Sequence, residues 1–332
     1  MLSSPASTAL LITVDTELSA LLHQRGLSLD DNVRSSIWGE AKGGAYGIGW
    51  QMGQLEQHGL KGVFFLDPMP ALVHGPEFLK PVVAAIAGRG HEVQLHIHSE
   101  WLAFAARSPV GGRTGRNIGD FALDDQLILL DMGRKWLEAA GAPRISAFRA
   151  GNFGANDDTL RALAQLGFAW DSSVNPAYHR HGCRITGARD LTGLTRCQGL
   201  PQAPVSGIND RPGNFRPAQV CAMSASEMQQ AVRHAAGEGH SAFIAVTHSF
   251  EMLSRDRQRP NHAVMRRFTA LCKEAANLPA ICSAGFHDLS TELASAESTA
   301  QSRLAPSHAR TASRRVQQVL ATWRYERRLL PA

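Results

Sequence analysis

The stretch that decides the fold is a short apolar run ending in two acids, residues 10–17, LLITVDTE. An apolar run of this length, rich in β-branched residues, is typical of a strand buried on both faces. Asp15 and Glu17 stand two residues apart, so both side chains point to the same side of an extended chain. Two like charges held together favour a cation between them. We therefore predict a buried strand with an acidic carboxyl end.

The same kind of run recurs along the chain and alternates with helical patterns. Further strands are predicted at 62–66, 92–97, 145–149, 169–172, 243–247 and 280–284. Helices are predicted at 50–58, 81–88, 123–140 and 260–276, and two more begin at the capping residues 156–158 and 224–227. This alternation indicates a parallel α/β architecture, either a closed barrel or an open sheet. Residues 175–220 break the rhythm, as expected of a long loop insertion that shapes a site.

Polar side chains stand at the carboxyl ends of five predicted strands. They are Asp15 and Glu17; His96, His98 and Glu100; Arg149 and Asn152; Asp171; and His248. The carboxyl ends of parallel strands converge on one face of a barrel or sheet, where active sites form. One such residue alone is more often structural, as a helix cap or a satisfied core histidine. Five strand ends together predict a site.

The residue types at these ends indicate particular chemistry. His96, His98 and Glu100 follow one another at steps of two, which projects all three to one side of an extended chain. Imidazole and carboxylate groups are ligands for zinc or a similar divalent ion. Arg149 ends an apolar run, which favours a buried guanidinium paired with a carboxylate. His248 is a candidate acid, because imidazole titrates near neutral pH.

At this level of detail the chain resembles the polysaccharide deacetylase family, also called the NodB-homology or carbohydrate esterase 4 group. The resemblance spans roughly residues 8–290 and consists of five motifs in the family's order. They are Thr13-Val14-Asp15-Thr16-Glu17; Gly90-His91-Glu92-Val93 with His96 and Glu100; Arg149-Ala150-Gly151-Asn152-Phe153-Gly154; Trp170-Asp171; and Val246-Thr247-His248. The fold implied by the resemblance is a distorted (β/α) barrel of seven strands.

The resemblance also implies a reaction, the metal-assisted hydrolysis of an N-acetyl group. Asp15 would be the base, held by Arg149, while His248 would protonate the leaving amine and Asp171 would steady its imidazolium. Asn152, Phe153 and Trp170 would contact the substrate. Thr16 replaces the family's usual metal-binding Asp, so Glu17 would supply that ligand. The implied metal set, for zinc or a similar ion, is Glu17 and His96 with either His98 or Glu100.

Two other functions are compatible with these residues. Metal-free relatives of the superfamily open cyclic amides such as allantoin, and a chain with altered ligands fits that group. A non-catalytic carbohydrate-binding protein is the second alternative. The joint presence of the predicted base, arginine and acid argues against it.

The distribution of charge divides the chain into a body and a tail. The net charge is +5, but residues 301–332 alone carry +6 and the remainder −1. A neutral body gives no reason to expect nucleic acid as a partner. We predict a barrel over 1–295 and a basic helical tail over 296–332. The tail helix, about 312–330, is interpreted first as packed on the barrel and second as touching an anionic membrane surface.

Cysteine usage and the amino terminus indicate a cytoplasmic protein. The five cysteines are widely spaced with no C-x-x-C pair, which favours free thiols in a reducing compartment. The first residues lack the pattern of a signal peptide. The predicted substrate is therefore a precursor, such as a nucleotide-linked or lipid-linked acetamido sugar used in surface-polysaccharide assembly.

Overall fold

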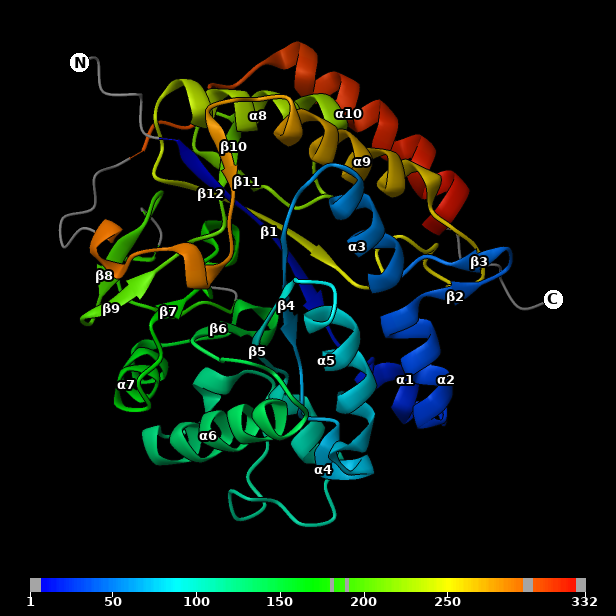
Figure 1. Ribbon diagram of the computed structural model, residues 1–332, viewed down its shortest axis with the longest axis vertical. Coiled ribbons are helices and arrows are strands. Elements are labelled where there is room, and N and C mark those ends of the chain that lie inside the picture. The colour runs from blue at the N-terminus through cyan, green and yellow to red at the C-terminus, as the bar shows by residue number, and fades with distance from the viewer. Residues whose placement is uncertain (1–6, 180–181, 189–190, 295–300, 327–332) are drawn as a thin grey trace.

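The computed structural model describes residues 7–179, 182–188, 191–294 and 301–326 (Figure 1). A curled sheet forms its centre, with the strand order β12-β1-β4-β5-β6-β7-β9-β8, and β13 pairs with the first residues of β1. The pairs are parallel except for β8 with β9. The strands are β1 (Thr8–Thr16), β4 (Gly62–Leu66), β5 (Glu92–Ile97), β6 (Ala147–Ala150), β7 (Trp170–Asp171), β8 (Thr195–Cys197), β9 (Leu200–Gln202), β12 (Ala242–His248) and β13 (Ile281–Ser283). The curled parallel sheet confirms the predicted distorted (β/α) barrel.

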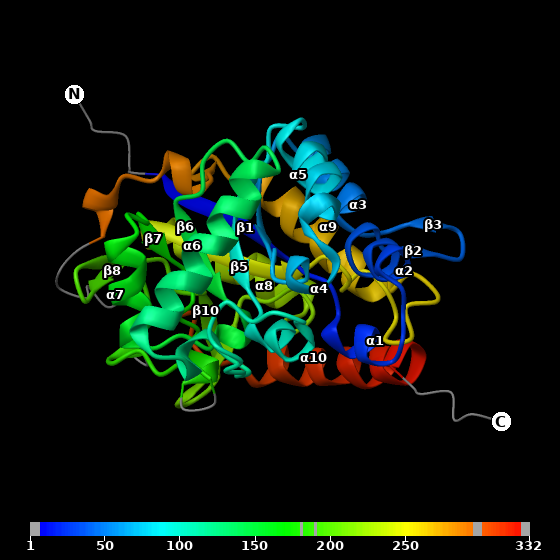
Figure 2. The same ribbon diagram turned by 90° about the horizontal axis from the view of Figure 1, so that it is seen from below.

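Helices lie around the outside of this sheet (Figures 1 and 2). They are α1 (Ala20–Gln24), α2 (Leu29–Val33), α3 (Ile48–Gln57), α4 (Ala71–His74), α5 (Leu79–Ala87), α6 (Leu123–Ala139), α7 (Asp157–Gln165), α8 (Ala225–Gly237), α9 (His262–Ala276) and α10 (His308–Ala321). The predicted capping residues do begin α7 and α8. The Asn156 side chain accepts a hydrogen bond from the Thr159 amide, and that of Ser224 accepts one from the Glu227 amide.

Alternation along the strands creates two apolar regions, one on each face of the sheet. Leu10, Ile12 and Val14 of β1 belong to the large cluster between the sheet and the helices. Leu11 faces the other way and joins a smaller cluster inside the barrel with Phe65 and Trp170. Further along β1 on that inner face come Thr13 and Asp15. The inside of the barrel is therefore apolar below and polar at the carboxyl ends of the strands.

The insertion at 175–220 is more ordered than the predicted loop, and that prediction was wrong. It supplies β8 and β9, which extend the central sheet from seven strands to nine. It also forms an antiparallel hairpin from β10 (Gly207–Arg211) and β11 (Asn214–Pro217). Buried Leu200, Val205 and Ile208 anchor these short strands. Their apolar side chains are too scattered in sequence to show a strand period.

The basic tail packs on the barrel through a polar face of α10. Arg314 is buried and donates hydrogen bonds to Asp210 Oδ2 (2.8 Å) on the hairpin and to Glu227 Oε1 (3.0 Å) on α8. The packed arrangement was the first of the two interpretations of the tail. The predicted boundary at 295/296 and the terminal residues Arg327 and Arg328 lie outside the described residues. Over the part of the chain that is described, no helix is long and apolar enough to cross a membrane.

Candidate active site

Strand register brings the predicted site residues together at one end of the barrel. Asp15 of β1 stands opposite His248 of β12, and His96 of β5 stands opposite Arg149 of β6. Residues opposite one another in a sheet project to the same face. All four side chains therefore belong to the polar layer above the inner apolar cluster.

Asp15 and Arg149 form a buried ion pair. Arg149 Nη1 lies 2.6 Å from Asp15 Oδ1 and 2.8 Å from Thr13 Oγ1, and Nη2 donates to Ser172 Oγ at 3.0 Å. The guanidinium carbon stands 4.3 Å from the centre of the Phe65 ring. Neither Arg149 nor Asp15 is more than 3% exposed in its side chain. The arginine holds the carboxylate in one orientation and compensates its charge away from water.

His248 lies on the other side of the same carboxylate. Its Nε2 is 3.9 Å from Asp15 Oδ2, and its Nδ1 is 2.8 Å from Glu251 Oε1. Burial by itself lowers the pKa of His248, but the charge and hydrogen bond of Glu251, with the charges of Asp15 and Glu17, raise it to about 9. The ring is therefore an imidazolium at neutral pH, the state required of a general acid.

Glu251 is a site residue that the sequence analysis missed. It also accepts hydrogen bonds from Thr247 Oγ1 (2.8 Å) and Gln219 Nε2 (2.9 Å). Burial raises the pKa of this carboxyl, but the charge and hydrogen bond of His248 outweigh that effect and lower it. An acid three residues after a strand-end histidine was the available signal. It was overlooked because the loop after β12 has no periodic pattern.

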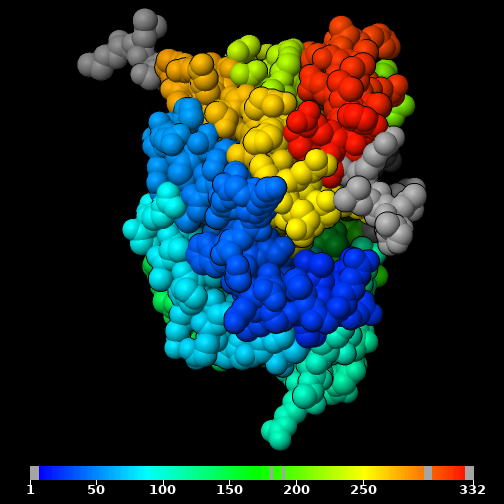
Figure 3. Space-filling view, turned by 90° about the vertical axis from the view of Figure 1, so that its right-hand side faces the viewer, coloured from blue at the N-terminus to red at the C-terminus, as the bar shows by residue number. Residues whose placement is uncertain are grey.

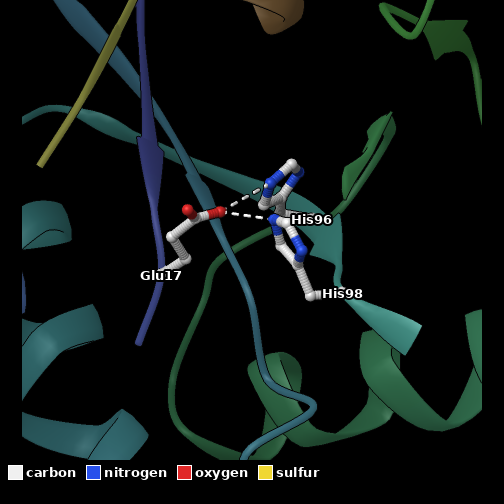
Figure 4. A group of neighbouring side chains, drawn as sticks. All are labelled: Glu17, His96 and His98. Carbon is white, nitrogen blue, oxygen red and sulfur yellow. Dashed lines mark ion pairs between the residues drawn. The ribbon is translucent and has the colours of Figure 1, made fainter. Parts of the chain in front are cut away.

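Three side chains converge beside this pair and form a candidate metal centre (Figure 4). Their ligand atoms, one each from Glu17, His96 and His98, lie within 4.8 Å of one another. Glu17 Oε2 is 3.3 Å from His96 Nε2 and 2.5 Å from His98 Nε2. This buried oxygen has no hydrogen bond of normal geometry. Two imidazoles and one carboxylate are a ligand set for zinc or a similar divalent ion.

The outer contacts of the two histidines also fit a metal. His96 Nδ1 lies 2.7 Å from the carbonyl oxygen of Arg149. A carbonyl only accepts hydrogen bonds, so Nδ1 carries a proton, and Nε2 is the ring nitrogen that points toward Glu17. Nε2 and Glu17 Oε2 lie 3.3 Å apart, and both atoms can bind the same metal ion. Metal-binding histidines are typically oriented in this way by a carbonyl or a carboxylate.

Glu100 lies outside the three-residue cluster and contacts the outer side of His98. Its Oε2 is 3.1 Å from His98 Nδ1 and accepts from Asn152 Nδ2 at 3.1 Å. Of the two alternatives for the third ligand, the geometry favours His98, with Glu100 as its orienting carboxylate. Asn152, expected to contact substrate, instead holds Glu100, and its backbone is in the left-handed region (φ 55°).

The ionisation of the cluster reflects these contacts. Burial raises the pKa of Glu17, but the charge of His98 and the contacts with both histidines outweigh it, and the pKa lies well below its usual value. Burial lowers the pKa of His98, yet the charge of Glu17 and the hydrogen bond to Glu100 raise it well above the usual value. A metal ion binding here would displace the proton of His98.

Asp67 is a second acid that the sequence analysis missed. It directly follows β4 and is 1% exposed. Its Oδ1 accepts from the amides of Met69 (3.0 Å) and His98 (3.3 Å). Burial raises the pKa of Asp67 to about 6, although the nearby charges of His98 and His96 act to lower it. The other site residues were selected as polar residues at the carboxyl ends of strands, and the same criterion would also have selected Asp67.

Asp171 and Trp170 do not take the places expected of them. In the β6–β7 register Asp171 pairs with Phe148, whose side chain faces the helices, so Asp171 points away from the barrel interior. It accepts from Ser173 Oγ at 2.5 Å, and the contact with His248 belongs to Glu251. Trp170 faces the interior but is fully buried in the inner apolar cluster, so it cannot touch a substrate. Both expectations are corrected by the alternation of side chains along β7.

Phe153 stands at the rim of the barrel. It is 7% exposed, its ring centre is 5.0 Å from that of Tyr178, and it packs with Val205 and Val246. Its backbone, like that of Asn152, has a positive φ of 55°. Two consecutive non-glycine residues in this region are uncommon and mark a constrained turn. Its contact with substrate stays a prediction.

Comparisons with known proteins support the fold. No protein-family model matches the sequence, and no curated protein sequence matches it. A predicted polysaccharide deacetylase from Mycobacterium smegmatis matches in structure over 88% of this chain and 92% of its own, with 15% identity and a TM-score of 0.56. The family 4 carbohydrate esterase from Streptomyces lividans in complex with acetate matches over 92% and 100%, with 12% identity and a TM-score of 0.43. The first of these structures supports the distorted (β/α) barrel fold of this chain, and at this identity the likeness concerns the fold alone.

Proposed function

We propose that this protein is a metal-dependent hydrolase that removes the acetyl group from the nitrogen of an acetamido sugar. One observation carries the proposal: a carboxylate held by a buried arginine, an imidazolium 3.9 Å from it, and a His-His-Glu cluster share one barrel end. A base, an acid and a metal centre are the three parts that hydrolysis of an amide requires.

Each residue has a defined part in this reaction. Asp15 accepts a proton from the attacking water, and Arg149 orients that carboxylate and compensates its charge. His248 donates a proton to the leaving nitrogen as the C–N bond breaks, and Glu251 stabilises the charged ring. The products are acetate and a free amino sugar. When bound to Glu17, His96 and His98, a divalent ion such as zinc supplies Lewis-acid activation of the carbonyl and the water.

The test is acetate release from a panel of acetamido sugars, combined with metal analysis of the purified protein. Stoichiometric zinc and acetate release together support the proposal. Hydrolysis of a cyclic amide such as allantoin by metal-free protein would instead favour the cyclic amide hydrolases. Sugar binding without any hydrolysis, by protein that has been loaded with zinc, would favour a non-catalytic carbohydrate-binding protein.

A cytoplasmic precursor is the proposed form of the substrate. The five cysteines are all free, in agreement with a reducing compartment. A nucleotide-linked or lipid-linked acetamido sugar of surface-polysaccharide assembly would be met in that compartment. Cell fractionation tests this location, and recovery of the protein from the exterior would contradict it.

A peripheral contact with an anionic membrane is the proposed role of the outer face of α10. Val316, Val319 and Leu320 are each more than 60% exposed at helical spacing, and Arg315 lies beside them. An apolar stripe flanked by arginines is typical of helices that lie on anionic lipid. Sedimentation with anionic vesicles, but not neutral ones, is expected for the wild type. Val319→Asp should abolish it, and binding retained in that variant would contradict the contact.

A further inference from the structure

A cavity of about 510 Å³ adjoins the candidate active site on the side of Glu251. Its walls come from the loop after β12, from α9 and from α10, which contributes Gln318 and Ala321. On the surface, the yellow segment that contains this loop lies between the red α10 and the dark-blue amino-terminal segment (Figure 3). Three arginines, Arg255, Arg257 and Arg267, line the cavity, and we call it the arginine pocket.

The two more buried arginines of this pocket bind neutral groups. Arg257 Nη1 donates to Ser36 Oγ, and its guanidinium carbon lies 4.5 Å from the centre of the Phe250 ring. Arg267 is 7% exposed and donates to the carbonyl oxygen of Cys221 at 2.8 Å. Within the described part of the chain, neither has a carboxylate oxygen at ion-pair distance.

Other buried arginines of this fold are paired with acids. Arg149 pairs with Asp15, and Arg314 pairs with both Asp210 and Glu227. A buried cation is costly unless a charge compensates it. Burial lowers the pKa of Arg257 to about 10, against the attraction of Glu17, and it also lowers the pKa of Arg267. The pocket is therefore built to receive a negative charge from outside the chain.

The acid in the pocket wall does not supply that charge. Glu251 already accepts from Gln219 Nε2 and contacts His248 Nδ1 and Cys221 Sγ. The pocket is lined by three arginines and by one carboxylate, that of Glu251, which already contacts His248, so the net charge of the lining is positive. The backbone of Arg257 supports a positioned role, since this non-glycine residue has a φ of 59° and its amide donates to the Ser254 carbonyl at 2.7 Å.

Phe250 links the pocket to the proposed acid. Its ring centre lies 5.4 Å from that of His248 and 4.5 Å from the guanidinium carbon of Arg257. Because both residues contact the same ring, a group bound by Arg257 would lie near the nitrogen that His248 would protonate. This separation suits a substituent on the sugar that carries the acetamido group.

We propose that the arginine pocket binds an oxyanion of the substrate, a phosphate or a carboxylate, and that Arg257 makes the specific contact. This inference rests on the proposed function and narrows its substrate to an anionic acetamido sugar. Guanidinium groups recognise both oxyanions through paired N–H donors, which is their shared chemistry.

The experiment is equilibrium binding by calorimetry, which does not depend on turnover. The probes are N-acetylglucosamine 1-phosphate, N-acetylmuramic acid and neutral N-acetylglucosamine at low ionic strength. Wild-type protein should bind at least one anionic sugar about tenfold more tightly than the neutral one, with the preference falling as salt is added. The two anionic probes distinguish phosphate from carboxylate. Equal affinity for all three sugars would overturn the proposal.

Matched variants assign the preference to the pocket. Arg257→Gln should remove most of the preference for the anionic sugar, and Arg257→Lys should retain part of that preference. The control is Arg161→Gln, at an exposed arginine paired with Asp158, which should bind like the wild type. If Arg257→Gln melts below the assay temperature, the exposed pocket residue Arg255 takes its place, and Arg255→Gln should weaken the preference by about threefold. A preference that survives in a folded Arg257→Gln protein, or in Arg255→Gln when that variant is used, overturns the proposal.

The binding and activity results remain distinguishable. An anion preference without acetate release from any sugar would refute the proposed reaction and leave the pocket standing. Acetate release with equal rates and affinities for neutral and anionic sugars would refute the pocket and leave the reaction standing.

Discussion

His248 Nδ1 lies 2.8 Å from Glu251 Oε1, and this contact sets the ionisation of the proposed acid. With the pKa of His248 at about 9, the ring stays charged at neutral pH and loses its proton above that value. The rate of a reaction that needs the imidazolium should therefore fall as pH rises through about 9.

Glu251→Gln tests this relationship. The neutral amide cannot stabilise the imidazolium by charge, so the pKa of His248 should fall and the alkaline limb of the pH profile of kcat/KM should move to lower pH. Glu238→Gln removes a carboxylate from the exposed end of α8 and is the control. An unchanged alkaline limb in Glu251→Gln would show that another group controls it.

Asp15→Asn should reduce kcat/KM by about 10²–10⁴-fold, because the amide cannot accept the proton of water. It also leaves Arg149 buried without its carboxylate, which costs about 3–5 kcal/mol of stability. The control is therefore Asp125→Asn, which breaks another ion pair of a buried acid, with Arg113. Acetate release at the wild-type rate by the Asp15 variant would refute its role as base.

Metal content should depend on the cluster and, more weakly, on Glu100. His96→Ala and His98→Ala should abolish stoichiometric zinc, while Glu100→Gln should weaken zinc affinity by about 10–100-fold, since it only orients His98. His262→Ala, at an exposed histidine, should bind zinc like the wild type. Equilibrium dialysis measures these affinities. Full zinc binding by both His96 and His98 variants would place the metal elsewhere.

Asp171→Asn should change stability in a pH-dependent way. Burial raises the pKa of this carboxyl from 3.8 to about 7, against the hydrogen bonds of Ser173 and the charge of Arg149. The folded chain therefore keeps a proton that the unfolded chain releases, and stability falls as pH rises from about 4 to about 7.

The Asn side chain does not titrate, so the free energy of unfolding of this variant should not fall in the same way. In urea at pH 8 it should exceed that of the wild type by roughly 4 kcal/mol at most. At pH 4 the two proteins should be nearly equal. Asp158→Asn, at a partly exposed acid in the first turn of α7, should show no such trend. A variant equally destabilised at both pH values would mean that the carboxylate is needed in its charged form.

The sequence alone determined the order of the parallel strands and the longer helices outside residues 175–220, and most of the polar layer. Its apolar runs were recognisable because parallel strands are buried on both faces, and β4 and β5 begin and end where predicted. Asp15, His96, Arg149 and His248 could be selected as polar residues at the ends of predicted strands, because the carboxyl ends of parallel strands must meet.

Only the tertiary structure decided what each side chain faces. Neighbouring residues of a strand face opposite ways, and the β6–β7 register decides that Asp171 faces the helices and Trp170 the inner cluster. Glu251 and the arginine pocket depend on the path of the loop after β12 and on α10, which folds back across the barrel. Long-range packing fixes such contacts, and no periodicity in the chain encodes them.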